Sequence, residues 1–147
     1  MRIFKNEDVI SKCDEDFIKQ YFQFTFYVQT MEYCVRRMCF VLADKNKKRY
    51  DKNTLEEASL GSLLYYLRKY DVNNVIYNED EFGINATAKN VRNYWSHQAF
   101  IDLKTNSVPY ERLKLRLSRD LAIIKPVSEH IEMLWMNFKS LYENAQK

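Results

Sequence analysis

Residues 17–42 carry apolar side chains at alternating intervals of three and four positions. This spacing places them on one face of an α-helix over about seven turns. The acidic run Asp14-Glu15-Asp16 or Ser11 can begin the helix, because carboxylates suit the positive end of its dipole, and a basic loop at 45–52 ends it. The sequence therefore predicts one long amphipathic helix, whose apolar face is Phe17, Tyr21, Phe24, Val28, Met31, Val35, Met38 and Leu42.

Glycine and proline are scarce, with two of each in the chain. Turn-dense β-sandwiches and glycine-looped nucleotide folds need many unusual backbone angles, so this scarcity disfavours both. The hydrophobic fraction of 46%, with 11 Tyr and 9 Phe among 147 residues, is too high for a disordered chain. Residues 1–147 are therefore expected to form a single domain.

Three further helices follow from start signals and helical spacing. Thr54-x-x-Glu57 is a capping box, 78–81 is an acidic helix start, and Ser107 with Pro109 begins a fourth helix. Pro126 either kinks the fourth helix or separates it from a fifth, and the kinked arm is preferred. We expect an all-α, antiparallel up-and-down bundle of four to five helices. The expected buried positions are Leu60, Leu63, Leu64, Leu67, Ile84, Ala88, Val91, Trp95, Leu113, Leu117, Leu121, Ile124, Ile131, Leu134, Trp135, Phe138, Leu141 and Tyr142.

Several classes of protein are disfavoured by composition. Cys13, Cys34 and Cys39 are odd in number and lack C-x-x-C spacing, which predicts reduced thiols and no zinc site. No apolar run approaches the roughly 18 to 20 residues that span a bilayer. The first residues also lack the features of a signal peptide, so a cytoplasmic protein is expected. The net charge of +3 permits a nucleic-acid partner without requiring one.

The segment from Arg92 to His97 concentrates groups suited to phosphate chemistry near the end of the third predicted helix. Arginine is a permanent cation that can hold two phosphate oxygens, and histidine can transfer a proton near neutral pH. His97 could deprotonate a ribose 2′-hydroxyl while Arg92 stabilises the negative charge on phosphate. RNA cleavage of this kind needs no metal and no cofactor, and leaves a 2′,3′-cyclic phosphate and a 5′-hydroxyl.

Arg92, Asn93 and His97, placed at the end of the third helix of a small bundle, resemble the Arg-x4-6-His motif of HEPN domains. Many HEPN proteins are ribonucleases of toxin–antitoxin, abortive-infection and CRISPR-associated systems. The resemblance implies catalytic Arg92 and His97, an assisting Asn93, and a homodimer in which two motifs face one cleft. It also implies RNA as substrate and a cognate antitoxin or other regulatory protein as partner. One branch carries a modified tyrosine two residues after the histidine, where this chain has Ala99.

Other residues have both a functional and a structural interpretation. Ser96 could hydrogen-bond RNA, and Tyr94 could stack on a base, whereas Trp95 follows the apolar stripe and is expected in the core. Arg112, Arg116 and Arg119 share one helix face and could bind an RNA backbone, as could the basic loop at 45–52. His130 is expected on a helix surface. Two alternatives to a nuclease stay open: a non-catalytic HEPN-like nucleotide or RNA-binding module, and a helical bundle that binds another protein.

Overall fold

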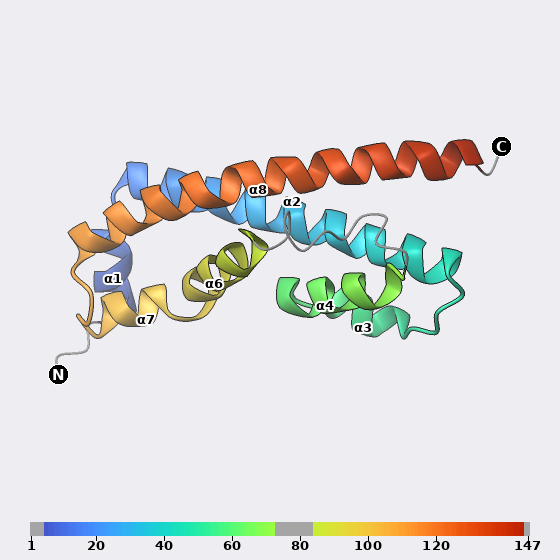
Figure 1. Ribbon diagram of the computed structural model, residues 1–147. Coiled ribbons are helices and arrows are strands. Elements are labelled where there is room, and N and C mark those ends of the chain that lie inside the picture. The colour runs from blue at the N-terminus through green and yellow to red at the C-terminus, as the bar shows by residue number, and fades with distance from the viewer. Residues whose placement is uncertain (1–4, 73–83, 146–147) are drawn as a thin grey trace.

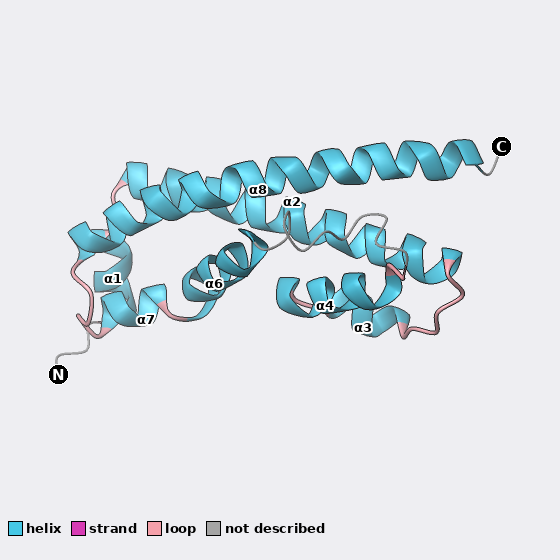
Figure 2. Cartoon of the chain, in the orientation of Figure 1, coloured by secondary structure: helices cyan, strands magenta, loops and turns pink. Residues whose placement is uncertain are grey.

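The computed structural model describes residues 5–72 and 84–145, and all regular structure within them is helical (Figures 1 and 2). The all-α prediction is thereby confirmed for the described chain. The acidic helix start predicted at 78–81 lies outside the described residues. The helices are α1 (Asn6–Lys12), α2 (Glu15–Lys45), α3 (Lys52–Glu57), α4 (Leu60–Tyr70), α6 (Ile84–His97), α7 (Ala99–Lys104) and α8 (Tyr110–Ala145).

The long helix α2 forms where the apolar spacing predicts it. Its N-cap is Asp14, whose carboxylate accepts a hydrogen bond of 2.8 Å from the amide of Phe17. Tyr21 is half-buried, and the other seven residues of the predicted stripe are buried. α2 therefore supplies the central apolar face against which the other helices pack.

The second predicted helix is two helices, and the predicted capping box is not its start. Asp51 caps α3 by accepting a hydrogen bond of 3.1 Å from the amide of Thr54, so Thr54 lies inside the helix. Ala58 and Ser59 are extended and separate α3 from α4. The Arg36 guanidinium donates hydrogen bonds of 3.0 Å to the Leu55 carbonyl and 3.0 Å to the Ala58 carbonyl. A cation at the C-terminal end of α3 thus stabilises the break.

The extra helix changes the packing of the two longest helices. The chain reverses direction at α3 and again at α4, so α2, α4 and α8 all run one way and α6 runs the other way (Figure 1). The Ser118 hydroxyl is 2.9 Å from the Gln20 side chain, and the Ser128 hydroxyl is 2.8 Å from the Tyr27 carbonyl. Because both residue numbers rise together, α2 and α8 run parallel. The expectation that neighbouring helices would all be antiparallel is wrong for α2 and α8, and also for α2 and α4, whose C-terminal ends meet.

α4 and α6 lie end to end along α2 (Figure 1). The Asn46 amide donates to the Tyr70 carbonyl at 2.7 Å, beside the C-terminal ends of both α2 and α4, so these two helices run in the same direction. α6 runs the other way, since its C-terminal part packs on the N-terminal half of α2 through Trp95 and Phe24. The beginnings of α4 and α6 therefore face each other over the middle of α2.

α8 begins directly after Pro109 and continues through Pro126 as one helix, which confirms the prediction of a single long arm over two separate helices. Its buried stripe differs from prediction at three described positions: Leu134 is half-buried, Leu141 is exposed, and Leu121 is displaced by its neighbour. Leu121 is half-buried, and Asp120 occupies the fully buried position instead. The short helices α1 and α7 were not predicted, and they contact each other at one end of the molecule.

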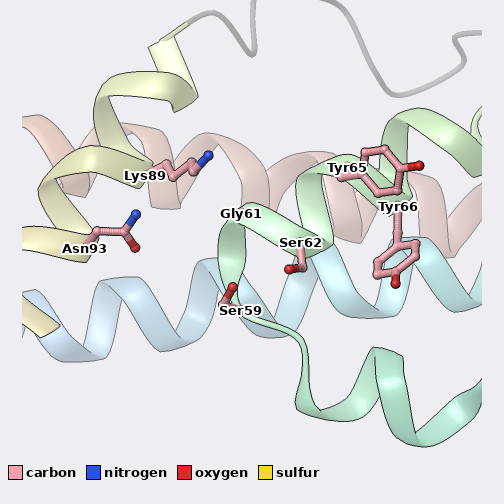
Figure 3. Close-up of a pocket in the computed structure, with 7 residues that line it drawn as sticks. All are labelled: Ser59, Gly61, Ser62, Tyr65, Tyr66, Lys89 and Asn93. Carbon is pink, nitrogen blue, oxygen red and sulfur yellow. The ribbon is translucent and has the colours of Figure 1, made fainter. Parts of the chain in front are cut away.

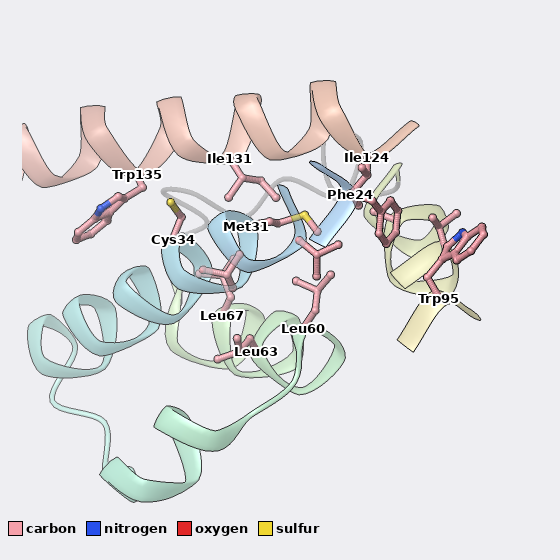
Figure 4. Packing of buried hydrophobic residues seen from close by; sticks show 14 of the residues in the cluster. Phe24, Met31, Cys34, Leu60, Leu63, Leu67, Trp95, Ile124, Ile131 and Trp135 are labelled. Atoms are coloured by element: carbon pink, nitrogen blue, oxygen red, sulfur yellow. The ribbon is translucent and has the colours of Figure 1, made fainter. Parts of the chain in front are cut away.

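The buried residues form one continuous core, in which side chains of α2 pack against those of α4, α6 and α8 (Figure 4). It contains Met31 and Leu63 from the middle of the molecule and Trp95 from α6, all at most 2% exposed. Of the other residues predicted to be buried, Leu64 is half-buried and Leu141 is 70% exposed, while the side chains of Ile84 and Tyr142 lie outside those described. Among the described residues, no helix combines the length and the apolar character needed to cross a bilayer.

Candidate functional site

α6 presents the predicted motif at an edge between the core and solvent. Ala88, Val91 and Trp95 recur at intervals of three and four residues and are buried, where α6 packs on α8 and, through Trp95, on Phe24 of α2. The helix ends at His97, after which the backbone turns into α7. Ser96 and His97 are exposed at this end, and Arg92 is half-buried.

Arg92 holds the centre of the site. Its Nε donates a hydrogen bond of 3.0 Å to Glu32 Oε1 of α2, and both side chains are largely covered, at 18% and 16% exposed. Its Nη1 lies 3.3 Å from Asn93 Oδ1 and 3.5 Å from His97 Nε2. The structure therefore brings the three residues of the predicted motif together within one chain.

Arg92 and His97 are in contact although their positions on α6 do not share a face. Residues five apart on a regular helix diverge by about 140° around the axis. The long arginine side chain spans this divergence, because Glu32 holds its Nε on the side of α6 that faces α2. An arginine always donates, so His97 accepts through Nε2 when its imidazole is neutral. One patch of surface thus carries a fixed cation and a group able to take up a proton.

Glu32 is a site residue that the sequence analysis missed. It follows Met31 of the buried stripe and is the one charged residue between Lys19 and Arg36. A carboxylate beside a buried stripe is usually paired, because burying an unpaired charge is costly. The isolation of Glu32 within an uncharged stretch is the sequence feature that could have identified it as a site residue.

A second polar cluster lies between α6 and α8, around the buried Asp120. Its Oδ2 accepts a hydrogen bond of 2.8 Å from the Trp95 indole and lies 3.5 Å from Arg116 Nε. Its Oδ1 accepts two hydrogen bonds of 3.2 Å from Arg119. Two of the three arginines predicted to bind RNA therefore neutralise a carboxylate that joins α6 to α8.

Tyr94 belongs to the same joint. Its hydroxyl donates a hydrogen bond of 2.9 Å to Asp102 of α7, and the Arg116 guanidinium lies 3.3 Å from the centre of its ring. Burial, followed by the hydrogen bond to Asp102, raises the pKa of Tyr94 to about 12. The guanidinium covers one face of this ring, so the predicted stacking of a base on Tyr94 is restricted to the other face.

The remaining predicted residues are spread over the surface. Arg112 is exposed near the start of α8, apart from the Arg92 contacts, and His130 is half-buried further along that helix. The basic residues of the loop after α2 are exposed. The sequence prediction that Arg112 binds RNA stays a prediction.

The cysteines are free, as predicted. Burial raises the pKa of Cys34 to about 11 and that of Cys39 to about 12, so neither forms a thiolate nucleophile near neutral pH. Across the ranges 5–72 and 84–145, no three His, Cys, Asp or Glu side chains are grouped so that they could hold a metal ion.

Compared with protein families, curated proteins and solved structures, the chain matches none. What the site can do must therefore follow from the residues of α2, α6 and α8.

Proposed function

We propose that this protein is a metal-independent endoribonuclease. The observation that carries the proposal is the distance of 3.5 Å between Arg92 Nη1 and His97 Nε2, on an arginine anchored by Glu32. An anchored arginine loses little conformational freedom when it binds a phosphate, so its charge is available to the transition state. His97 is exposed, which leaves it open to a ribose beside that phosphate.

The proposed reaction is an attack of the ribose 2′-oxygen on the adjacent phosphorus. When Arg92 Nη1 donates to a phosphate oxygen instead of to His97, the freed Nε2 takes the 2′-hydroxyl proton as the new P–O bond forms, and the bond from phosphorus to the 5′-oxygen breaks. Arg92 stabilises the charge on the non-bridging oxygens, while Asn93 orients the guanidinium through its contact of 3.3 Å. The 5′-oxygen receives a proton as it leaves. The products are a 2′,3′-cyclic phosphate and a 5′-hydroxyl.

A homodimer is part of this proposal, because the leaving oxygen needs an acid as well as the base. One chain contributes one imidazole to the Arg92 site, and a second copy facing it would contribute another. The outer face of α2 supports association, since it carries exposed apolar side chains at helical spacing, which is typical of contact surfaces. These exposed residues are Ile18, Phe22, Phe26 and Tyr33.

The same site underlies the proposed biological class. An RNA-cleaving helical protein with Arg92, Asn93 and His97 in contact agrees with the HEPN-type nucleases expected from the sequence. We place it as a toxin or defence effector that acts in the cytoplasm. The activity of such a nuclease must be inhibited in the cell that makes it, so an antitoxin or other regulatory protein is the proposed partner.

The test is cleavage of single-stranded RNA in the presence of EDTA. Arg92→Ala and His97→Ala should each reduce the rate by about 10² to 10⁴, the usual contribution of such groups. His130→Ala is the matched control, since it removes the other histidine and should cleave as wild type does. Equal rates for wild type, Arg92→Ala and His97→Ala would contradict the proposal.

The dimer is tested separately by measuring molecular mass in solution. Phe26→Asp places a charge on the exposed face of α2 without touching the core, because Phe26 is 59% exposed. Wild type should have the mass of two chains and Phe26→Asp that of one, with reduced cleavage. A monomeric wild type that cleaves RNA would contradict the need for a second copy.

A binding module without cleavage is the second candidate function. It is favoured by the pairing of Arg92 with His97 within one chain, since a single imidazole suffices to bind a phosphate. RNA binding that depends on Arg92, with no cleavage by wild type, would select this function.

A further inference from the structure

A pocket of about 380 Å³ opens where the starts of α4 and α6 face each other (Figure 3). Ser59, Ser62, Tyr65 and Tyr66 line it from the α4 side. Its lining is both polar and aromatic, which is the composition expected for a nucleotide more than for an apolar ligand. None of the residues in this pocket is assigned a role in the proposed reaction except Asn93.

Lys89 supplies the positive charge of the pocket. It is exposed on α6, and no carboxylate within residues 5–72 or 84–145 forms an ion pair with it. Its side chain lies across Gly61, where an added Cβ would come within 3.0 Å of Lys89 Cε. The absence of a side chain at Gly61 thus gives Lys89 room to lie over the start of α4. An exposed ammonium at the wall of a pocket suits a phosphate.

Tyr65 supplies an aromatic surface at the same pocket. Its side chain is 63% exposed, and its ring meets the Tyr66 ring edge-on at 5.5 Å. Tyr66 is in turn stacked on Tyr70 at 5.8 Å, so the three rings support one another. A supported and exposed ring is the feature on which single-stranded bases stack.

Asn93 connects this pocket to the proposed active site. It lines the pocket, and its Oδ1 is 3.3 Å from Arg92 Nη1. A chain of nucleotides held with one phosphate at Arg92 therefore reaches the pocket past Asn93. The open lining matches a segment of single-stranded RNA that continues beyond the cleaved linkage.

We propose that the pocket between α4 and α6 binds the nucleotide next to the scissile linkage of single-stranded RNA, with Lys89 on its phosphate and Tyr65 on its base. The identification of the ligand as RNA rests on the proposed function. It assigns the α4–α6 pocket to substrate binding, and the Arg92 site to the chemical step.

The test uses a fluorescent single-stranded RNA of random sequence that carries a 2′-O-methyl group at every position. This probe cannot be cleaved by 2′-hydroxyl attack, so binding is measured apart from catalysis. Lys89→Ala should weaken binding about fivefold at low salt and reduce the slope of log affinity against log salt by about 0.7. Tyr65→Ala should weaken binding about tenfold, and Tyr65→Phe, which keeps the ring, should bind as wild type does.

Lys19→Ala is the control for charge, because Lys19 is an exposed lysine of α2 that does not line the pocket. If Lys89→Ala binds no more weakly than Lys19→Ala, or Tyr65→Ala binds as tightly as Tyr65→Phe, the proposal is overturned. A wild type that does not bind the probe overturns it as well. Failure of the nuclease proposal is distinct, since it shows as absent cleavage of unmodified RNA while binding still depends on Lys89 and Tyr65.

Discussion

Two arginine–carboxylate clusters flank α6, and they are built in opposite ways. Around Arg92 and Glu32 both side chains are mostly covered, and the arginine keeps Nη1 directed at His97. Around Asp120 the carboxylate is completely buried, while Arg116 and Arg119 remain 36% and 65% exposed. The first cluster fixes a cation and leaves it a donor for a ligand. The second uses two cations to neutralise a buried anion, and so joins two helices.

The largest effect on stability is expected at the second cluster. Asp120→Ala leaves the buried Trp95 indole without its acceptor and removes the partner of two arginines. The free energy of unfolding should fall by about 2 to 3 kcal/mol, as measured by urea denaturation. Glu129→Ala, an exposed change on the same helix, should stay within about 0.5 kcal/mol. A loss at Asp120 no greater than this control would mean that the joint is not stabilising.

An intermediate effect, on catalysis, is expected at the first cluster. Glu32→Gln removes the charge that anchors Arg92 while keeping an oxygen able to accept from it. Cleavage should fall about tenfold, which corresponds to about 1.4 kcal/mol of transition-state stabilisation. Glu56→Gln is the matched control, because Glu56 is an exposed glutamate of α3 that pairs with the exposed Lys52 at 3.8 Å. Unchanged cleavage by Glu32→Gln would show that Arg92 needs no anchor.

The smallest effect is expected at Tyr94. Tyr94→Phe removes its hydrogen bond to Asp102 and should lower the free energy of unfolding by about 1 kcal/mol at neutral pH. The pKa of Tyr94, about 12, lies above the value near 10 of an unfolded tyrosine. Its contribution is therefore complete below pH 10 and is lost as the pH rises toward 12, because the unfolded chain deprotonates first. Urea denaturation across this range should show a shallower decline for Tyr94→Phe, and an equal decline would contradict the assignment.

Features that depend on the local spacing of residues could be predicted from the sequence. The stripe of α2 and the position of Arg92 to His97 at the end of α6 follow from helical spacing, and both are found. The break between α3 and α4 has no such signal at Ala58 and Ser59. It depends on Arg36, which reaches the carbonyls of α3 from another helix.

The polar partners of the site were harder to predict than its centre. Asp120 occupies an interval that an apolar pattern assigns to Leu121, and only the contacts with Trp95 and two arginines explain its burial. Glu32 stood out in the sequence by its isolation, yet its partner lies 60 residues away. Pairing across helices is decided by the fold, and sequence spacing alone does not reveal it.

The most direct test of the central claim is the chemistry of the RNA ends produced by purified protein in EDTA. If Arg92 and His97 promote attack by the 2′-hydroxyl, wild type leaves 2′,3′-cyclic phosphates and 5′-hydroxyls, and His97→Ala leaves almost none. Ends bearing a 3′-hydroxyl and a 5′-phosphate, or identical products from His97→Ala, would contradict it.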